Sequence, residues 1–147
     1  MMDTLTIRNF LQSFDCFKGV YPRDKLPKIK QKPASLIVNT DKSHEPGEHW
    51  IAIILKRNGK GEYFDSFGLP PLHKEIIKFL NENCPNGWCY NTVTLQHFSA
   101  VTCGYYCVVY VMLRCSGFRY CEYIQLFTTI PNINDNIIVN IINKIHA

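Results

Sequence analysis

Cys103 stands where a thiol is able to act as a nucleophile. The pair Cys103-Gly104 lies seven residues after Gln96 and directly before a long apolar run, Tyr105 to Leu113. The run contains no Gly or Pro, and Gly117 follows it as a natural helix stop, so we predict a buried helix with Cys103 at or just before its first turn. Unpaired backbone N–H groups and the helix dipole favour a thiolate there. A core helix with a buried, inert cysteine is the alternative.

Three further polar residues stand at the predicted ends of strands. His49 precedes the apolar run WIAIIL, Asp65 lies in the returning segment FDSFG, and Gln96 ends the segment CYNTVTLQ. A hairpin turning at Asn58-Gly59 pairs His49 near residue 68, which puts Asp65 at the same end of the sheet. Each residue alone also has an ordinary explanation, as a surface histidine, a turn aspartate or a strand-end glutamine.

Together these four residues supply the parts of a thiol acyl-transfer site. Cys103 is the candidate nucleophile and His49 the candidate base. Asp65 would hold the imidazole in one tautomer. Gln96 would donate its amide to an oxyanion, with the backbone N–H of Cys103 as the second donor. The convergence of three strand ends on one helix start therefore predicts catalysis by a cysteine.

The elements that must position these residues indicate an α+β fold. The hydrophobic spacing predicts a small, mostly antiparallel sheet packed against the helix that starts at Cys103, with flanking helices and one domain over 1–147. Helices are expected over 3–14, 71–82, 119–128 and 132–146, and strands over 36–40, 50–57, 61–68 and 89–96. The segment 15–34 contains Gly19, Pro22, Pro27 and Pro33 and is therefore expected to be a loop.

The formal charge of +4 is confined to the first part of the chain. Residues 1–35 contain seven Lys or Arg and three Asp or Glu, whereas the remaining residues contain nine of each. A solvated loop accounts for this excess, and a DNA-binding patch is the alternative. The lysines concerned are Lys25, Lys28, Lys30 and Lys32.

The cysteines favour a reducing compartment. There are seven of them, an odd number, and the N-terminus MMDTLTIRNF is not expected to be a signal peptide. No stretch free of charged residues reaches the length expected of a membrane-spanning helix. Cys84 and Cys89 lack two further ligands at zinc spacing, so no metal is expected. Cys107 and Cys115 fall on the apolar helix, where thiols are usually inert core fillers.

The order of these residues resembles the adenovirus-type maturation proteases and, more distantly, the proteases specific for SUMO and other ubiquitin-like modifiers. The strongest matches are the pair His49-Trp50 and the spacing from Gln96 to Cys103-Gly104. The segment IVNT, the pair Phe67-Gly68, FKGVYPRDKL and LFTTIPNIN are also similar. The resemblance therefore covers nearly the whole chain.

This resemblance implies a thiol endopeptidase with Cys103 as nucleophile, His49 as base, Asp65 as orienter and Gln96 as oxyanion donor. It also implies that Trp50 and Gly104 border the substrate. The adenovirus enzyme has Glu where this chain has Asp65, and Asp is found in the SUMO-specific enzymes. The chain is also shorter towards its C-terminal end.

The function implied is cleavage of precursor proteins at glycine-containing sites, with viral capsid or core precursors cut during virion maturation in the host nucleus or the virus particle. No cofactor is expected for the chemistry, although the adenovirus-type enzymes are stimulated by DNA and by a viral peptide. The partners implied are protein substrates, nonspecific DNA and an activating peptide, but no membrane. A protease of ubiquitin-like modifiers and a catalytically silent DNA- or protein-binding module are the alternatives.

Overall fold

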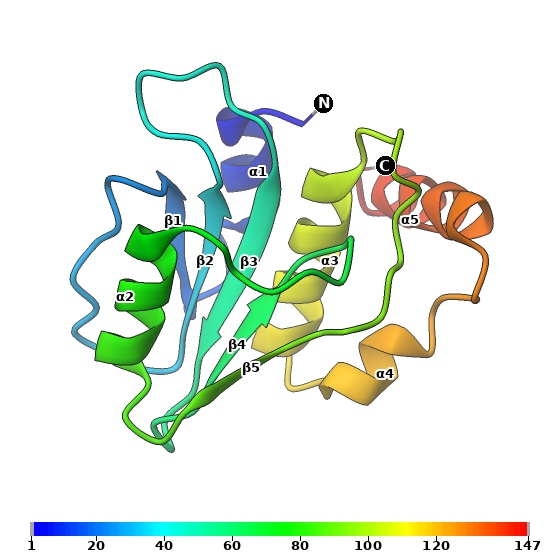
Figure 1. Ribbon diagram of the computed structural model, residues 1–147. Helices are drawn as coiled ribbons and strands as arrows, with labels where there is room; N and C mark the ends of the chain where they lie inside the picture. Colours follow the sequence, from blue (N-terminus) through cyan, green and yellow to red (C-terminus); the bar gives the residue numbers. More distant parts are fainter. Residues whose placement is uncertain (1, 147) are drawn as a thin grey trace.

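The computed structural model describes residues 2–146 and has the predicted α+β architecture (Figure 1). Its central sheet has five strands in the spatial order β1-β2-β3-β4-β5. The pairs β2–β3 and β3–β4 are antiparallel, whereas the outer pairs β1–β2 and β4–β5 are parallel. The elements are α1 (Thr4–Leu11), β1 (Phe17–Pro22), β2 (Ala34–Asn39), β3 (Trp50–Leu55), β4 (Gly61–Phe64), α2 (Lys74–Asn83), β5 (Trp88–Tyr90), α3 (Cys103–Cys115), α4 (Tyr120–Ile124) and α5 (Pro131–His146).

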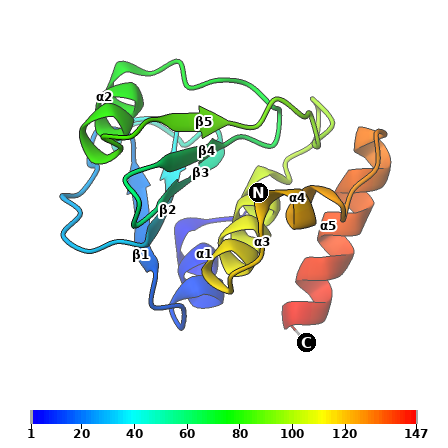
Figure 2. The same cartoon turned by 90° about the horizontal axis from the view of Figure 1, so that it is seen from below.

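Helices cover both faces of the sheet. Figure 2 shows α2 on one face and α1 and α3 on the other, with α5 outside α3. All six residues of β3 are buried, because its alternate side chains enter two separate cores. Trp50, Ala52 and Ile54 belong to the core around α3. Ile51, Ile53 and Leu55 belong to the core beneath α2.

The hairpin predicted from Asn58-Gly59 is confirmed. Ala52 pairs with Phe64 and Leu55 pairs with Gly61 across β3 and β4. Gly59 has a φ of 80°, the left-handed conformation that the turn requires. This register brings the start of β3 and the end of β4 to the same edge of the sheet, as the argument for His49 and Asp65 requires.

Two predictions about the sheet were wrong in part, one of a loop and one of a strand. The segment expected to be a loop contains β1, which pairs in parallel with β2 through Val20 and Ile37. An edge strand tolerates the prolines that argued against it, because one side of its backbone makes no ladder hydrogen bonds. The strand predicted over 89–96 is only Trp88–Tyr90, and the chain beyond it is irregular.

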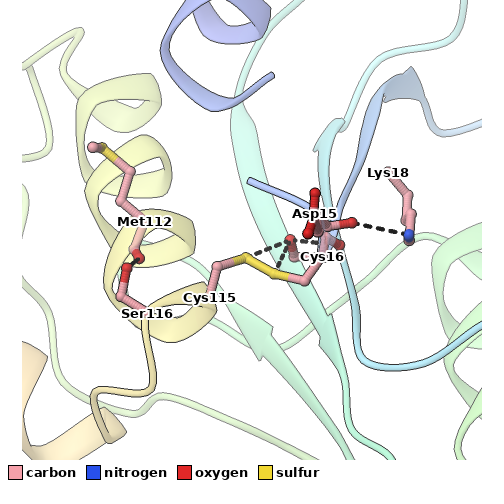
Figure 3. Close-up of a disulfide and its surroundings, with 7 residues drawn as sticks. Asp15, Cys16, Lys18, Met112, Cys115 and Ser116 are labelled. Atoms are coloured by element: carbon pink, nitrogen blue, oxygen red, sulfur yellow. Dashed lines mark hydrogen bonds between the residues drawn. A yellow bond between two sulfur atoms is a disulfide. The ribbon is translucent and has the colours of Figure 1, made fainter. Parts of the chain in front are cut away.

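A disulfide joins Cys115, at the end of α3, to Cys16, just before β1 (Figure 3). The two Cα atoms are 6.0 Å apart and the residues are 99 positions apart in the sequence. The prediction that Cys115 is a free core filler was therefore wrong. Sequence spacing gave no sign of this pair, because β1, which brings Cys16 beneath α3, was itself not predicted. The bridge does not fit the free thiols expected in a reducing compartment.

None of the helices within residues 2–146 has the length and apolar character needed to cross a membrane.

Candidate active site

Three elements bring Cys103, His49 and Asp65 together. Cys103 is the first residue of α3, as predicted. His49 directly precedes β3 and Asp65 directly follows β4. The antiparallel pairing of these strands places both side chains at the sheet edge that faces the start of α3.

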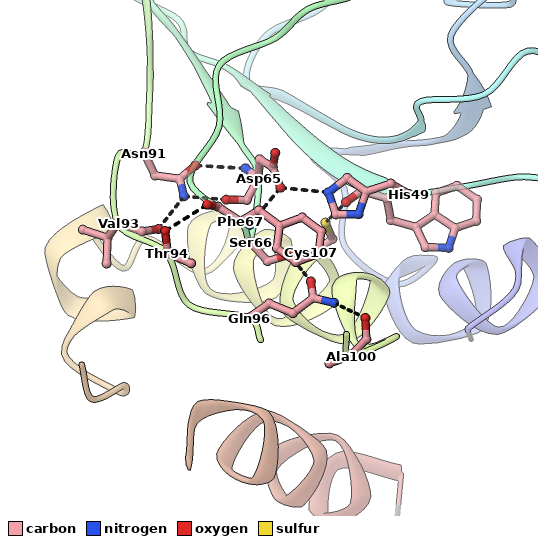
Figure 4. Close-up of polar contacts among 11 residues, drawn as sticks. His49, Asp65, Ser66, Phe67, Asn91, Val93, Thr94, Gln96, Ala100 and Cys107 are labelled. Atoms are coloured by element: carbon pink, nitrogen blue, oxygen red, sulfur yellow. Dashed lines mark hydrogen bonds and ion pairs between the residues drawn. The ribbon is translucent and has the colours of Figure 1, made fainter. Parts of the chain in front are cut away.

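His49 is held by Asp65 in one orientation. Its Nε2 lies 2.8 Å from Asp65 Oδ1, and Figure 4 shows the two side chains pointing toward each other. The Phe67 ring stacks on the imidazole with centroids 4.9 Å apart. Because Asp65 engages Nε2, Nδ1 is the nitrogen left to exchange a proton with Cys103.

The electrostatics favour a thiolate–imidazolium pair. Burial of the His49 ring opposes its protonation, but the hydrogen bond and charge of Asp65 and the neighbouring Cys103 outweigh burial and raise the pKa of His49 to about 9. Burial likewise opposes ionisation of Cys103, yet His49 and the backbone N–H groups of Trp50 and Gly104 lower the pKa of the thiol. The two shifts reinforce each other, which is the arrangement that activates a cysteine nucleophile.

A cavity of about 380 Å³ reaches these residues. Cys103 is only 2% exposed, so this cavity is its route to a substrate. Its lining includes all four predicted catalytic residues, and most of the other lining side chains are apolar. The full lining is Thr40, Glu48, His49, Tyr63, Asp65, Phe67, Leu69, Pro70, Leu72, His73, Gln96, Phe98, Ala100, Val101 and Cys103.

Gln96 lies in this cavity but not at the end of a regular strand, which corrects the sequence-based placement. The backbone N–H groups of Leu95 and Gln96 both donate to the Ser66 carbonyl. The Gln96 Oε1 accepts from Ser66 Oγ at 2.5 Å, and its Nε2 donates to the Ala100 carbonyl at 2.8 Å. A primary amide has two N–H groups, so one remains for an oxyanion.

Trp50 and Gly104 are placed beneath the site and do not line the cavity. Trp50 is buried, and its Nε1 donates to the Met2 carbonyl at 2.9 Å. A Cβ added to Gly104 would lie 3.1 Å from Met2 Cβ and from Trp50 Cδ1. These contacts give Gly104 a packing reason to lack a side chain. The geometry thus does not support the prediction that this pair contacts the substrate.

The four lysines predicted to bind DNA do not all have the same surroundings. Lys25, Lys28 and Lys30 are exposed, and Lys28 and Lys30 border a shallow groove with Lys18. The Lys32 ammonium instead donates to the Asn83 carbonyl at the end of α2. Lys32 therefore caps a helix, and DNA binding by the others stays a prediction.

Cys84 and Cys89 differ in their surroundings. Cys84 is buried and Cys89 is exposed, and both are free thiols. Within residues 2–146, no group of three His, Cys, Asp or Glu side chains is arranged to hold a metal ion.

Sequence reasoning missed the residues that fix Asp65 and Gln96. The Asn91 side chain accepts from the Asp65 backbone N–H at 2.9 Å and donates to the Asp65 carbonyl at 2.6 Å. It thus continues the pairing of β4 and β5 by one side-chain step (Figure 4). Ser66 holds the Gln96 amide. The only available signal was the polar character of FDSFG and of Asn91 just after an apolar pair.

No family model matches the sequence, and no curated protein matches it. Among solved structures, the fold is similar to the crystal structure of the selenomethionine form of the ASFV pS273R protease, with 25% sequence identity and a TM-score of 0.49. The match covers 69% of this chain and 41% of that chain. It leaves the narrower likeness to adenovirus-type enzymes untested. The function proposed below therefore rests on the geometry of the site.

Proposed function

We propose that this chain is a cysteine endopeptidase in which Cys103 is the nucleophile and His49 the general acid and base. The observation that carries the proposal is the 2.8 Å contact between His49 Nε2 and Asp65 Oδ1, together with the opposite pKa shifts of His49 and Cys103. A histidine fixed by a carboxylate and paired with a thiol at a helix start is the arrangement that acyl transfer requires.

The reaction follows from these positions. The Cys103 thiolate attacks the peptide carbonyl carbon, and the carbonyl electrons move to oxygen, where the free N–H of Gln96 and the backbone N–H of Cys103 stabilise the oxyanion. As the C–N bond breaks, the His49 imidazolium gives its proton to the leaving amine. Neutral His49 then takes a proton from water as the water oxygen attacks the thioester carbon. The C–S bond breaks, which releases the acid and restores the Cys103 thiolate beside the His49 imidazolium. Asp65 keeps the imidazole oriented throughout.

The substrate class that we propose is a precursor protein cut at a glycine-containing site, with viral structural precursors as the natural example. This proposal is supported by the pair His49-Trp50 and the spacing from Gln96 to Cys103-Gly104, which resemble those of the adenovirus-type maturation proteases. A protease of ubiquitin-like modifiers would use the same chemistry, and a glycine-ended probe is suited to both. A panel of precursor peptides and modifier fusions would separate these substrates.

The experiment is incubation with a glycine-ended peptide vinyl sulfone, followed by mass mapping of the modified cysteine. We expect addition at Cys103 and none at Cys89 or Cys121, which are free and more exposed but have no imidazole partner. Cys103→Ala is the matched control and should abolish labelling. Labelling of Cys89 and Cys121 with Cys103 untouched would contradict the proposal and favour a binding module.

A further inference from the structure

The segment between Gln96 and Cys103 carries one proposed oxyanion donor and ends at the other. It contains no regular helix or strand, and its placement is therefore set by hydrogen bonds rather than by a ladder. Ser66 fixes its beginning through the Leu95 and Gln96 backbone N–H groups. Ser66 also donates from its hydroxyl to the Gln96 side chain, and the Tyr106 hydroxyl of α3 donates to the Leu95 carbonyl at 3.4 Å. The remaining side-chain contacts from other elements come from α5, a helix that does not line the cavity holding Cys103.

Two adjacent residues of α5 make these contacts. Asn134 is fully buried, and its Nδ2 donates to the Leu95 carbonyl at 3.1 Å. Asp135 accepts from the His97 backbone N–H on Oδ2 at 3.2 Å and from the Thr102 hydroxyl on Oδ1 at 3.0 Å. The pair therefore contacts the segment on both sides of Gln96 and again just before Cys103.

Asn134 and Asp135 are themselves held in place. Asn134 Oδ1 accepts from the Thr128 backbone N–H at 2.7 Å and from the Thr128 hydroxyl at 2.9 Å. Asp135 Oδ1 also accepts from the Tyr106 hydroxyl at 2.7 Å, and Tyr106 lies one turn into α3. A side chain fixed by such contacts is able to transmit the position of a rigid helix to an irregular segment.

The Thr102 contact has a second consequence for the start of α3. Thr102 is the N-cap residue, and an N-cap threonine usually accepts a hydrogen bond from the first helical N–H groups. Here its hydroxyl donates to Asp135, and within residues 2–146 its side chain makes no capping hydrogen bond. The N–H groups that open α3 are thus left for the thiolate and the oxyanion.

We propose that Asn134 and Asp135 are positioning residues that fix the segment 95–102, and with it the Gln96 oxyanion donor, relative to Cys103. This inference rests on the proposed peptidase function. It gives α5 an indirect role in turnover, because α5 would act through the segment 95–102 without contacting the substrate. A displacement of about 1 Å at a catalytic group costs about a hundredfold in rate, so loss of one contact should be visible in kcat.

The test uses Asp135→Asn in the full chain. The amide has nearly the same shape as the carboxylate, but only one of its two terminal atoms is an oxygen that accepts hydrogen bonds. The His97 N–H and the Thr102 hydroxyl each use a different oxygen of Asp135, so the variant must lose one of these contacts. Ile142→Val is the control, because Ile142 is a buried apolar residue of the same helix, two turns beyond Asp135, and belongs to the core around α3. Four quantities are measured for each variant. They are kcat and KM on a glycine-ended peptide aminomethylcoumarin, the rate of Cys103 alkylation by iodoacetamide, and amide hydrogen exchange over 96–102.

For Asp135→Asn we expect kcat to fall by about tenfold, part of the loss that a 1 Å displacement produces, with KM and the alkylation rate close to wild type. Hydrogen exchange should rise over 96–102 and not within α3. Alkylation needs only the thiolate–imidazolium pair, so its persistence separates misplaced oxyanion donors from a damaged pair. Ile142→Val should keep kcat and lose only thermal stability.

The proposal is overturned if kcat of Asp135→Asn matches that of Ile142→Val, or if alkylation falls in step with kcat. Failure of the peptidase proposal has a different signature, because the wild-type protein would then neither cleave the peptide nor react with the vinyl sulfone. In that case hydrogen exchange decides, and unchanged exchange over 96–102 in Asp135→Asn overturns the positioning role.

Discussion

The two ends of α3 each hold a buried carboxylate beside a basic group, yet they differ in what they can do. At the N-terminal end, Asp65 is 5% exposed and contacts His49, which neighbours Cys103. At the C-terminal end, Glu62 is 6% exposed and binds Arg114 through two contacts of 3.0 and 2.6 Å. The Lys56 ammonium lies 2.9 Å from the same carboxylate.

The difference lies in the basic partner and in the third group. Arg114 remains charged at any ordinary pH, and Glu62 is surrounded by the donors Arg114, Lys56 and Tyr110. Its ion pair is therefore static. His49 titrates and lies between a carboxylate and a thiol, so it is able to give and take a proton. The same helix thus has a reactive end and an end that only stabilises the fold.

The largest expected effect is at the reactive end. Cys103→Ala should remove turnover while the protein stays folded, a fall in kcat on the order of 10⁶. His49→Ala should cost nearly as much because the two act as a unit, and Asp65→Asn should cost less because the ion pair can form without it. Steady-state kinetics measures the turnover of each variant, and circular dichroism shows whether the variant is folded.

Glu62→Gln is the matched variant at the other end of α3. Breaking its buried ion pair should cost about 3 kcal/mol of unfolding free energy and leave kcat unchanged. If Cys103→Ala kept its turnover, or if Glu62→Gln lost turnover without losing stability, the assignment of the two ends would be wrong.

Gln96 should give the next largest effect. Gln96→Ala is expected to lower kcat by about 10²–10³ with little change in KM, because the donor acts on the transition state. Gln96→Glu should be worse, since an anion repels the oxyanion. Wild-type kcat in Gln96→Ala would mean that its amide serves only the Ala100 carbonyl.

The disulfide should affect stability alone. Cys16→Ala is expected to cost about 2–5 kcal/mol, the usual range for a native bridge that closes a long loop, with kcat unchanged once the protein is folded. Urea unfolding measures the loss, and Cys121→Ala, at an exposed free thiol, is the control. Alkylation of the protein unfolded in urea should count five free thiols before reduction and seven after it. Seven thiols without reduction would show that the bridge is absent.

The two ends should also respond oppositely to pH. The folded-state pKa of His49 is raised from 6.5 to about 9, so its contribution to stability is complete below pH 6.5 and lost as pH rises through about 9. Turnover should fall over the same range as the imidazolium is lost. Burial opposes ionisation of Glu62, but Arg114, Lys56 and Tyr110 outweigh it and lower its pKa below 4.5. Its contribution is complete above 4.5 and lost as pH falls.

Thermal unfolding of wild type and Glu62→Gln across this range tests the difference. The variant should be destabilised at neutral pH and approach wild type in acid. A stability gap between them that persists unchanged in strong acid would contradict the role given to Glu62.

The site was predictable from sequence where it depends on local order along the chain. Asn58-Gly59 fixed the hairpin and hence the proximity of His49 and Asp65, and the uninterrupted apolar run located the start of α3. Contacts between distant segments were not predictable. Asn91 and Ser66 lie in irregular backbone whose course no periodicity encodes. Asp135 lies on a helix that was predicted, but its contacts are with the irregular segment before Cys103. The partner of Cys115 lay in a segment whose prolines argued against a strand.

The thiolate–imidazolium pair is best tested by the rate of Cys103 alkylation by iodoacetamide at about pH 6, where an ordinary thiol is almost entirely protonated. Mass spectrometry gives the rate at each cysteine in wild type and in His49→Ala. We expect Cys103 of the wild type to react far faster than Cys89 and Cys121, and His49→Ala to remove this advantage. Equal rates at the three cysteines in the wild type would contradict the claim that Cys103 and His49 form a thiolate–imidazolium pair.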